Sequence, residues 1–147
     1  MIRKILYPFV LLIFTVSQLT AQNWLTNLNE AKQKAQDDHK NILLVFFGSD
    51  WCAPCMKLER TIWQSEEFKT FAKEHFILLK ADFPKQKKNQ LEPLLQEQNN
   101  QLAAKYNKNG FFPLVVILDK DGKLLGSTGY KNVTPKDYID ILASLEK

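Results

Sequence analysis

Two cysteines, Cys52 and Cys55, stand in the pentapeptide WCAPC and are the residues of this chain best suited to chemistry. Thiols separated by two residues can ligate a metal, attach a haem, form a small structural disulfide or exchange electrons with another disulfide. A closed zinc site needs four ligands, but the two histidines, His39 and His75, lie far from the cysteines in sequence. We therefore predict that both histidines are surface residues and that the chain has no metal site of this kind. A haem attachment site needs a histidine directly after the second cysteine, and Met56 stands there instead.

Electron exchange fits the position of the cysteine pair best. An apolar strand that ends at Trp51 would leave Cys52 exposed at the N-terminus of the next helix, where unpaired N–H groups and the helix dipole stabilise a thiolate. Cys55 lies nearly one helical turn later, and Pro54 stiffens that turn and holds the two sulfurs close. Cys52 would attack a substrate disulfide, and Cys55 would then attack Cys52 and release the reduced substrate.

Two other uses of the pair stay open on these residues. A copper relay would use Cys52, Cys55 and Met56 as soft donors for the metal. A purely structural disulfide would close a loop of only four residues, and closing so short a loop stabilises a fold little.

The segments around the pair alternate between strand and helix patterns. The run NILLVFFG is almost entirely apolar, as in a strand that is buried on both faces. Alternating elements followed by a β-hairpin predict an α/β fold with a central mixed sheet and helices on both faces. The expected elements are a helix over 23–38, a strand over 41–48, a helix from about 53, another from Ser65 to about Glu74, a strand over 76–83, a helix within 84–109, a hairpin from Pro113 to Tyr130 and a helix after Thr134.

The segment over 84–109 is polar and rich in Lys, Gln and Asn. A helix within it would have one apolar face, made by Leu94, Leu95, Leu102 and Tyr106. The lysines at positions 85, 87 and 88 form a short basic run, which we interpret as a solvated loop.

The N-terminal segment has the layout of a secretory signal peptide. Arg3 and Lys4 precede a short apolar stretch, and the polar residues SQLTA lead to a cleavage site after Ala21. Because a membrane span needs about 20 apolar residues, a retained anchor is the weaker interpretation. The expected organisation is a signal peptide over 1–21 and one domain over 22–147 that works outside the cytoplasm. The formal net charge of +4 includes the two charges of the leader, and the remainder is too small to indicate nucleic-acid binding.

Three segments together resemble the thioredoxin superfamily: LLVFFGSDWCAPC, FILLKADF and KYNKNGFFPLVVILDKDGKLL. The segment GSDWCAPCMKLE is more closely similar to the thioredoxin-like proteins grouped with the C-terminal domain of DsbD, the transmembrane thiol reductant transporter. The resemblance spans about 24–146. It implies a thioredoxin fold with an extra helical insertion before the cis-proline loop. It also implies that Cys52 attacks, that Cys55 resolves, and that no cofactor is needed besides the redox-active disulfide Cys52–Cys55.

The resemblance also implies a set of substrate-binding residues. Trp51 would pack beside the cysteines, and Ala53 and Pro54 lie between them. Pro113 matches the family's cis-proline, so the peptide bond between Phe112 and Pro113 is predicted to be cis. The backbone of Phe112 would then pair with an extended substrate segment.

Glu59 matches a glutamate that some family members place behind the second cysteine, where it could handle the proton of that thiol. On its own, a glutamate one turn beyond Cys55 is equally typical of a surface helix position. The chain departs from the family at Phe46, where thioredoxins carry a buried aspartate, and this leaves Glu59 or water to accept the proton. It also departs over 84–105, which is longer than the matching segment by on the order of 15 residues. This insertion would form either a helix near the active-site face or a solvated loop.

These features predict an exported thiol–disulfide oxidoreductase, in the periplasm or outside the cell, that reduces protein disulfides. Its electron donor would be a membrane thiol reductant transporter, and a monomer is expected. The alternatives are a disulfide oxidant or isomerase, a copper relay, and a redox-inert binding module on the same fold.

Overall fold

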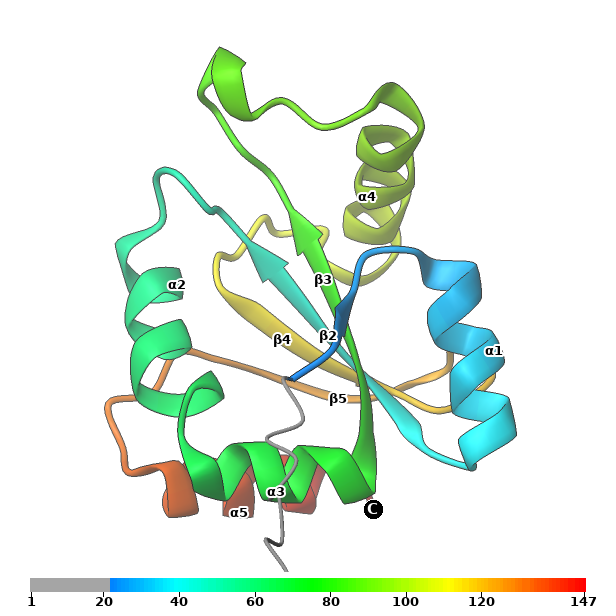
Figure 1. The fold of residues 1–147 in the computed structure, drawn as a ribbon, viewed down its shortest axis with the longest axis vertical. Helices are drawn as coiled ribbons and strands as arrows, with labels where there is room; N and C mark the ends of the chain where they lie inside the picture. Colours follow the sequence, from blue (N-terminus) through cyan, green and yellow to red (C-terminus); the bar gives the residue numbers. More distant parts are fainter. Residues whose placement is uncertain (1–21) are drawn as a thin grey trace, which may run out of the picture.

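The computed structural model describes residues 22–147, and the expected signal peptide lies outside the described residues. One sheet runs through the molecule with its strands in the order β1-β3-β2-β4-β5 (Figure 1). Its first three strands in sequence are parallel, and the last two are antiparallel to their neighbours. This confirms the predicted mixed sheet. The strands are β1 (Trp24–Leu25), β2 (Asn41–Phe47), β3 (Phe76–Asp82), β4 (Leu114–Leu118) and β5 (Leu124–Gly129).

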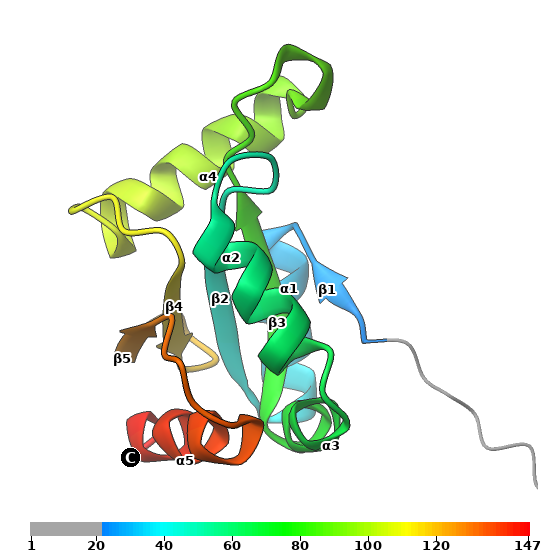
Figure 2. The same ribbon diagram turned by 90° about the vertical axis from the view of Figure 1, so that its left-hand side faces the viewer.

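Helices cover both faces of the sheet, as predicted. Figure 2 shows α2 in front of the sheet and α1 behind it. One face packs against α2, α3 and α5, and the other packs against α1 and α4. The helices are α1 (Leu28–Asp38), α2 (Ala53–Leu58), α3 (Glu66–His75), α4 (Pro93–Tyr106) and α5 (Pro135–Leu145), and a π-helical turn over Glu59–Trp63 continues α2.

Strand β2 is buried because it lies between β3 and β4 with helices on both of its faces. Its side chains alternate between two hydrophobic clusters. Leu43 and Val45 pack on the side of α2, whereas Leu44 and Phe46 pack on the side of α1. A strand enclosed in this way has no polar face, which explains the unbroken apolar run in the sequence.

The helix predicted over 23–38 is wrong in its first turn. Trp24 and Leu25 form β1 and pair in parallel with β3, and α1 begins only at Leu28. Asn27 caps this helix, because its side chain accepts a hydrogen bond from the backbone N–H of Glu30 at 2.9 Å. Pairing with the sheet edge therefore overrides the helical spacing of the first apolar residues.

The predicted apolar face of α4 is also wrong in part. Leu94 is 87% exposed, whereas Asn99 is 1% exposed. The side-chain amide of Asn99 donates to the backbone carbonyl of Asp82 at 3.0 Å, which satisfies its buried nitrogen. Leu102 is buried as predicted. The helix is therefore held to the end of β3 by a hydrogen bond as well as by apolar contacts.

A cluster of aromatic rings fills the core between the sheet and the helices on the α2 side. Trp63 is fully buried at its centre. The centroid of its indole lies 4.5 Å from that of Phe68, 5.6 Å from that of Tyr138 and 5.7 Å from that of Trp24. Burial raises the pKa of Tyr138 well above its ordinary value, and its hydroxyl donates to the carbonyl of Gly129 at 2.9 Å. Within residues 22–147, no helix has the length and apolar character of a membrane span.

Candidate active site

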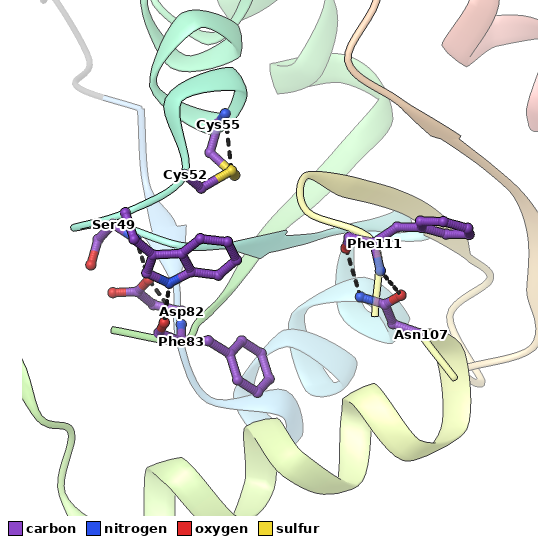
Figure 3. The surroundings of a disulfide bond; sticks show 8 residues. Ser49, Cys52, Cys55, Asp82, Phe83, Asn107 and Phe111 are labelled. Atoms are coloured by element: carbon purple, nitrogen blue, oxygen red, sulfur yellow. Dashed lines mark hydrogen bonds between the residues drawn. A yellow bond between two sulfur atoms is a disulfide. The ribbon is translucent and has the colours of Figure 1, made fainter. Parts of the chain in front are cut away.

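Cys52 and Cys55 form a disulfide at the start of α2. Cys52 is the N-cap residue, and its sulfur accepts a hydrogen bond from the backbone N–H of Cys55 at 3.3 Å (Figure 3). Ala53 and Pro54 lie between the two cysteines and are both exposed. The N–H that points at the Cys52 sulfur is one of the unpaired donors of the first helical turn. This donor is placed to stabilise a thiolate on Cys52 after reduction.

The prediction that Cys52 is exposed is wrong in the disulfide form. The residue is only 3% exposed. Strand β2 ends at Phe47, and a turn over 48–51 separates the strand from α2. This turn folds back, so the N–H of Cys52 donates to the carbonyl of Gly48 at 3.0 Å. The cysteine is therefore drawn into the end of the hydrophobic core that contains Leu58.

Trp51 forms part of the surface beside the disulfide and is 39% exposed. Its indole N–H donates to the carbonyl of Phe83 at 2.7 Å. Its ring lies 5.2 Å from that of Phe112, and the rings of Phe112 and Phe83 are 5.4 Å apart. A Cβ atom at position 48 would lie 2.5 Å from the Trp51 ring. Glycine at this position therefore leaves room for the ring. The aromatic residues of three separate segments thus meet next to the cysteines.

The loop before β4 lies across from the disulfide. The peptide bond between Phe112 and Pro113 is cis, which confirms the prediction. Pro113 is buried, whereas Phe111 is 58% exposed. The first paired residue of β4 is Leu114, so the backbone of Phe112 precedes the hydrogen-bonded part of the sheet.

Asn107 holds this loop in place, a role that is not predicted from the sequence. The residue is 5% exposed. Its side-chain amide donates to the carbonyl of Phe111 at 2.8 Å, and its side-chain oxygen accepts from the N–H of Phe111 at 2.9 Å (Figure 3). This paired arrangement imitates the hydrogen bonding of a strand. The sequence signal was a single asparagine near a glycine, which is typical of any turn.

Glu59 lies in the π-helical turn after α2 and takes part in an ion pair. One carboxylate oxygen accepts from the ammonium of Lys80 at 3.2 Å, and the other accepts from the side chain of Gln64 at 2.9 Å. The side chains of Glu59 and Lys80 are 23% and 22% exposed. The Lys80 ammonium also lies over the ring of Phe47, 4.5 Å from its centroid. Glu59 is therefore a half-buried, partnered carboxylate rather than a free surface residue.

The insertion before the cis-proline loop contributes to the active-site end of the molecule. Figure 1 shows its first part, over 84–92, at the same end of the sheet as the turn that carries the cysteines. Asp50 joins the two segments. Its carboxylate accepts from the backbone N–H of Lys85 and of Gln86 at 2.9 Å each, and from the side chain of Asn89 at 3.0 Å.

These hydrogen bonds, chiefly that of the Lys85 backbone and then that of the Asn89 side chain, hold the pKa of Asp50 below its ordinary value. The carboxylate therefore stays ionised at neutral pH and keeps its acceptor role. Asp82 adds a second link, because its carboxylate accepts from the N–H of Ser49 at 2.9 Å. Neither aspartate has a recognisable spacing in the sequence, so neither is predicted as a site residue.

The two histidines lie apart from the cysteines, as predicted. Both are exposed. His39 ends α1 in a left-handed conformation, and His75 lies 3.0 Å from a carboxylate oxygen of Glu146. In the part of the chain that the structure describes, no three His, Cys, Asp or Glu side chains come together in a way that could hold a metal ion.

A mixed sheet with a CxxC disulfide at a helix N-terminus, facing a cis-proline loop, defines a thiol–disulfide oxidoreductase of the thioredoxin superfamily. Residues 23–120 match the thioredoxin-like family, and the chain belongs to that family. It is 44% identical over 118 residues to the disulfide bond reductase DsbH of Chlamydia pneumoniae, covering 80% of this chain and 69% of the relative.

Solved structures agree with this assignment. The structure of a DsbH oxidoreductase superposes with a TM-score of 0.78 at 35% sequence identity, covering 86% of this chain and 85% of that chain. The C-terminal domain of DsbD from Neisseria meningitidis, in its oxidised form, superposes with a TM-score of 0.56 at 16% identity, covering 79% of this chain and 90% of that chain. The second likeness concerns the fold alone. Together these similarities confirm the thioredoxin fold and the resemblance that the sequence segments indicate.

Proposed function

We propose that this protein reduces the disulfides of other proteins outside the cytoplasm. The observation that carries the proposal is the Cys52–Cys55 disulfide at the start of α2, beside Trp51 and the cis-proline loop. The 44% identity to a protein described as a disulfide bond reductase supports the reducing direction. The signal-peptide pattern of the first 21 residues supports the location.

The reaction begins with both cysteines reduced. The thiolate of Cys52 attacks one sulfur of the substrate disulfide, which forms a mixed disulfide and releases the other substrate sulfur as a thiolate. The thiolate of Cys55 then attacks the sulfur of Cys52. This step breaks the mixed disulfide, releases the second substrate thiolate and leaves the Cys52–Cys55 disulfide. Two electrons have then passed to the substrate, and a donor must return two electrons to the protein. We propose a membrane thiol reductant transporter as that donor.

The substrate segment would bind across the residues that surround the disulfide. Ala53 and Pro54 are exposed beside the sulfurs, and Trp51 presents part of its ring on the same side. An extended substrate would place its backbone next to that of Phe112, just before the paired part of β4. Pro113 would keep the turn of this loop in place.

Glu59 would accept the proton of Cys55 in the second step. Replacing Glu59 with glutamine is therefore expected to slow the resolution of the mixed disulfide by on the order of a hundredfold. The first attack, by Cys52, should keep its rate. Rapid-quench kinetics with a disulfide-bonded substrate would measure the two steps separately. Glu74 is an exposed glutamate on α3, and its replacement with glutamine is the matched control. Equal rates of resolution in both variants would contradict a proton-handling role for Glu59.

The direction of electron flow depends on the reduction potential of the Cys52–Cys55 pair. We expect a value near that of thioredoxin, about −270 mV. Equilibrating the purified protein with a series of glutathione mixtures and following Trp51 fluorescence would give the value. A potential near that of DsbA, about −120 mV, would instead indicate an oxidant that introduces disulfides. Insulin reduction driven by dithiothreitol would check that the pair is active in either case.

A further inference from the structure

The first part of the insertion carries positive charge next to the disulfide. We call residues 84–90 the lysine loop. Its sequence, PKQKKNQ, contains three lysines and no acidic residue. Lys85 lies over the ring of Trp51, with its ammonium 3.9 Å from the ring centroid. Lys87 and Lys88 belong to a short exposed 3₁₀ turn that follows.

The charges of the lysine loop are not neutralised by ion pairs. Within residues 22–147, none of its three lysines forms an ion pair with a carboxylate. The nearby carboxylate of Asp50 accepts hydrogen bonds from the backbone and the amide side chain of the loop. Asp50 therefore holds the loop against the active-site turn without pairing with the lysine ammonium groups, and their charges remain available to an acidic partner.

We propose that the lysine loop selects substrate segments that carry acidic residues beside the reactive cysteine. This inference rests on the proposed function, since it concerns the substrates of the same site. A segment that crosses Trp51 and Phe112 to reach Cys52 would pass close to the ammonium of Lys85, which lies over the Trp51 ring. A glutamate or aspartate near the substrate cysteine would pair with it, whereas a lysine there would be repelled.

The expected effect is mainly on the rate of encounter. Charges at the rim of a binding site change the association rate and its dependence on salt more than they change the final affinity. Screening is strong at high ionic strength, because the Debye length falls from about 10 Å at 0.1 M to about 3 Å at 1 M. A preference that comes from the lysine loop must therefore weaken as salt is added.

Three disulfide-bonded peptides test the proposal. They are identical except for the residues that flank the cysteine, which are Glu, Gln or Lys. The pre-reduced protein is expected to reduce the Glu peptide at least about fivefold faster than the Lys peptide at low salt, with the Gln peptide between them. At about 1 M salt the three rates should converge. Equal rates at low salt would overturn the inference, whereas failure to reduce any of the peptides would contradict the proposed function.

Two triple variants distinguish the effect of the lysine loop from the effect of the protein's net charge. The variant K85Q/K87Q/K88Q is expected to lose the preference for the Glu peptide. The variant K34Q/K120Q/K123Q removes the same charge from exposed lysines on α1 and the β4–β5 turn, and it should keep the preference. A similar loss in both variants would overturn the assignment to the lysine loop.

The variant Asp50→Ala tests whether Asp50 positions the lysine loop. The change in charge and the loss of hydrogen bonds predict opposite changes in the preference for the Glu peptide. Removing this carboxylate makes the surroundings of the cysteines more positive, and on charge alone it should increase the preference for the Glu peptide. We expect the preference to fall, because the lysine loop loses the acceptor of three hydrogen bonds that place Lys85 over Trp51. An unchanged or increased preference would contradict the positioning role of Asp50.

Discussion

Replacing Cys52 with serine is expected to lower the rate of disulfide reduction by at least about a thousandfold. A hydroxyl is a far weaker nucleophile than a thiolate, and it cannot form a mixed disulfide. Dithiothreitol-driven insulin reduction would measure the loss. Because the chain has only two cysteines, the variant retains Cys55 as its single thiol, and any remaining activity would come from that residue.

The variant Cys55→Ser is expected to behave differently. Cys52 would still attack the substrate, but the second step would stop, and the mixed disulfide would accumulate. Trapping free thiols after an acid quench, followed by mass spectrometry, would detect the linked species and locate it at Cys52. The reverse pattern, with accumulation in Cys52→Ser and none in Cys55→Ser, would exchange the roles of the two cysteines.

Replacing Trp63 with alanine is expected to reduce the free energy of unfolding by about 3–5 kcal/mol. The indole is fully buried among the rings of Trp24, Phe68 and Tyr138, so its removal leaves a cavity that rigid neighbours cannot fill. Urea denaturation of the oxidised protein would give the difference.

Trp51→Ala provides the matched control for this measurement. Its ring is 39% exposed, and we expect the free energy of unfolding to fall by less than about 1.5 kcal/mol. Its main effect should be on the rate of substrate reduction, because the ring would form part of the surface that binds the substrate segment. Equal destabilisation by the two substitutions would contradict the packing described for Trp63.

The arrangement of the sheet could be predicted because its central strands have a strong and simple signal. Strand β2 is buried on both faces, so its apolar run is unbroken and its length is clear. The two-residue strand β1 could not be found in this way. Trp24 and Leu25 also fit the helical spacing of Ala31 and Ala35, and only pairing with β3 decides between the two structures.

The cysteine pair and the cis-proline could be predicted from the sequence. The residues that hold the surrounding loops in place could not. Cys52 and Cys55 are identified by their spacing, and the cis bond before Pro113 by resemblance. Asp50 and Asn107 act through hydrogen bonds to loop backbones that are distant in sequence or lie within a turn. Such contacts depend on the position of each loop, and no periodic pattern of residue types accompanies them.

The low exposure of Cys52 bears on how fast different molecules can exchange with the pair. At 3% exposure, this cysteine is poorly accessible to small thiols and oxidants that arrive from random directions, and the rate of exchange depends on access. A protein partner that binds across Trp51 and the cis-proline loop, as proposed, would bring its own sulfur to Cys52 along a defined approach. We therefore expect the pair to exchange more slowly with small thiols than with a docked protein. Electrons would then leave and enter faster through docked proteins than through small thiols, and long equilibration with glutathione would still bring the pair to its own potential.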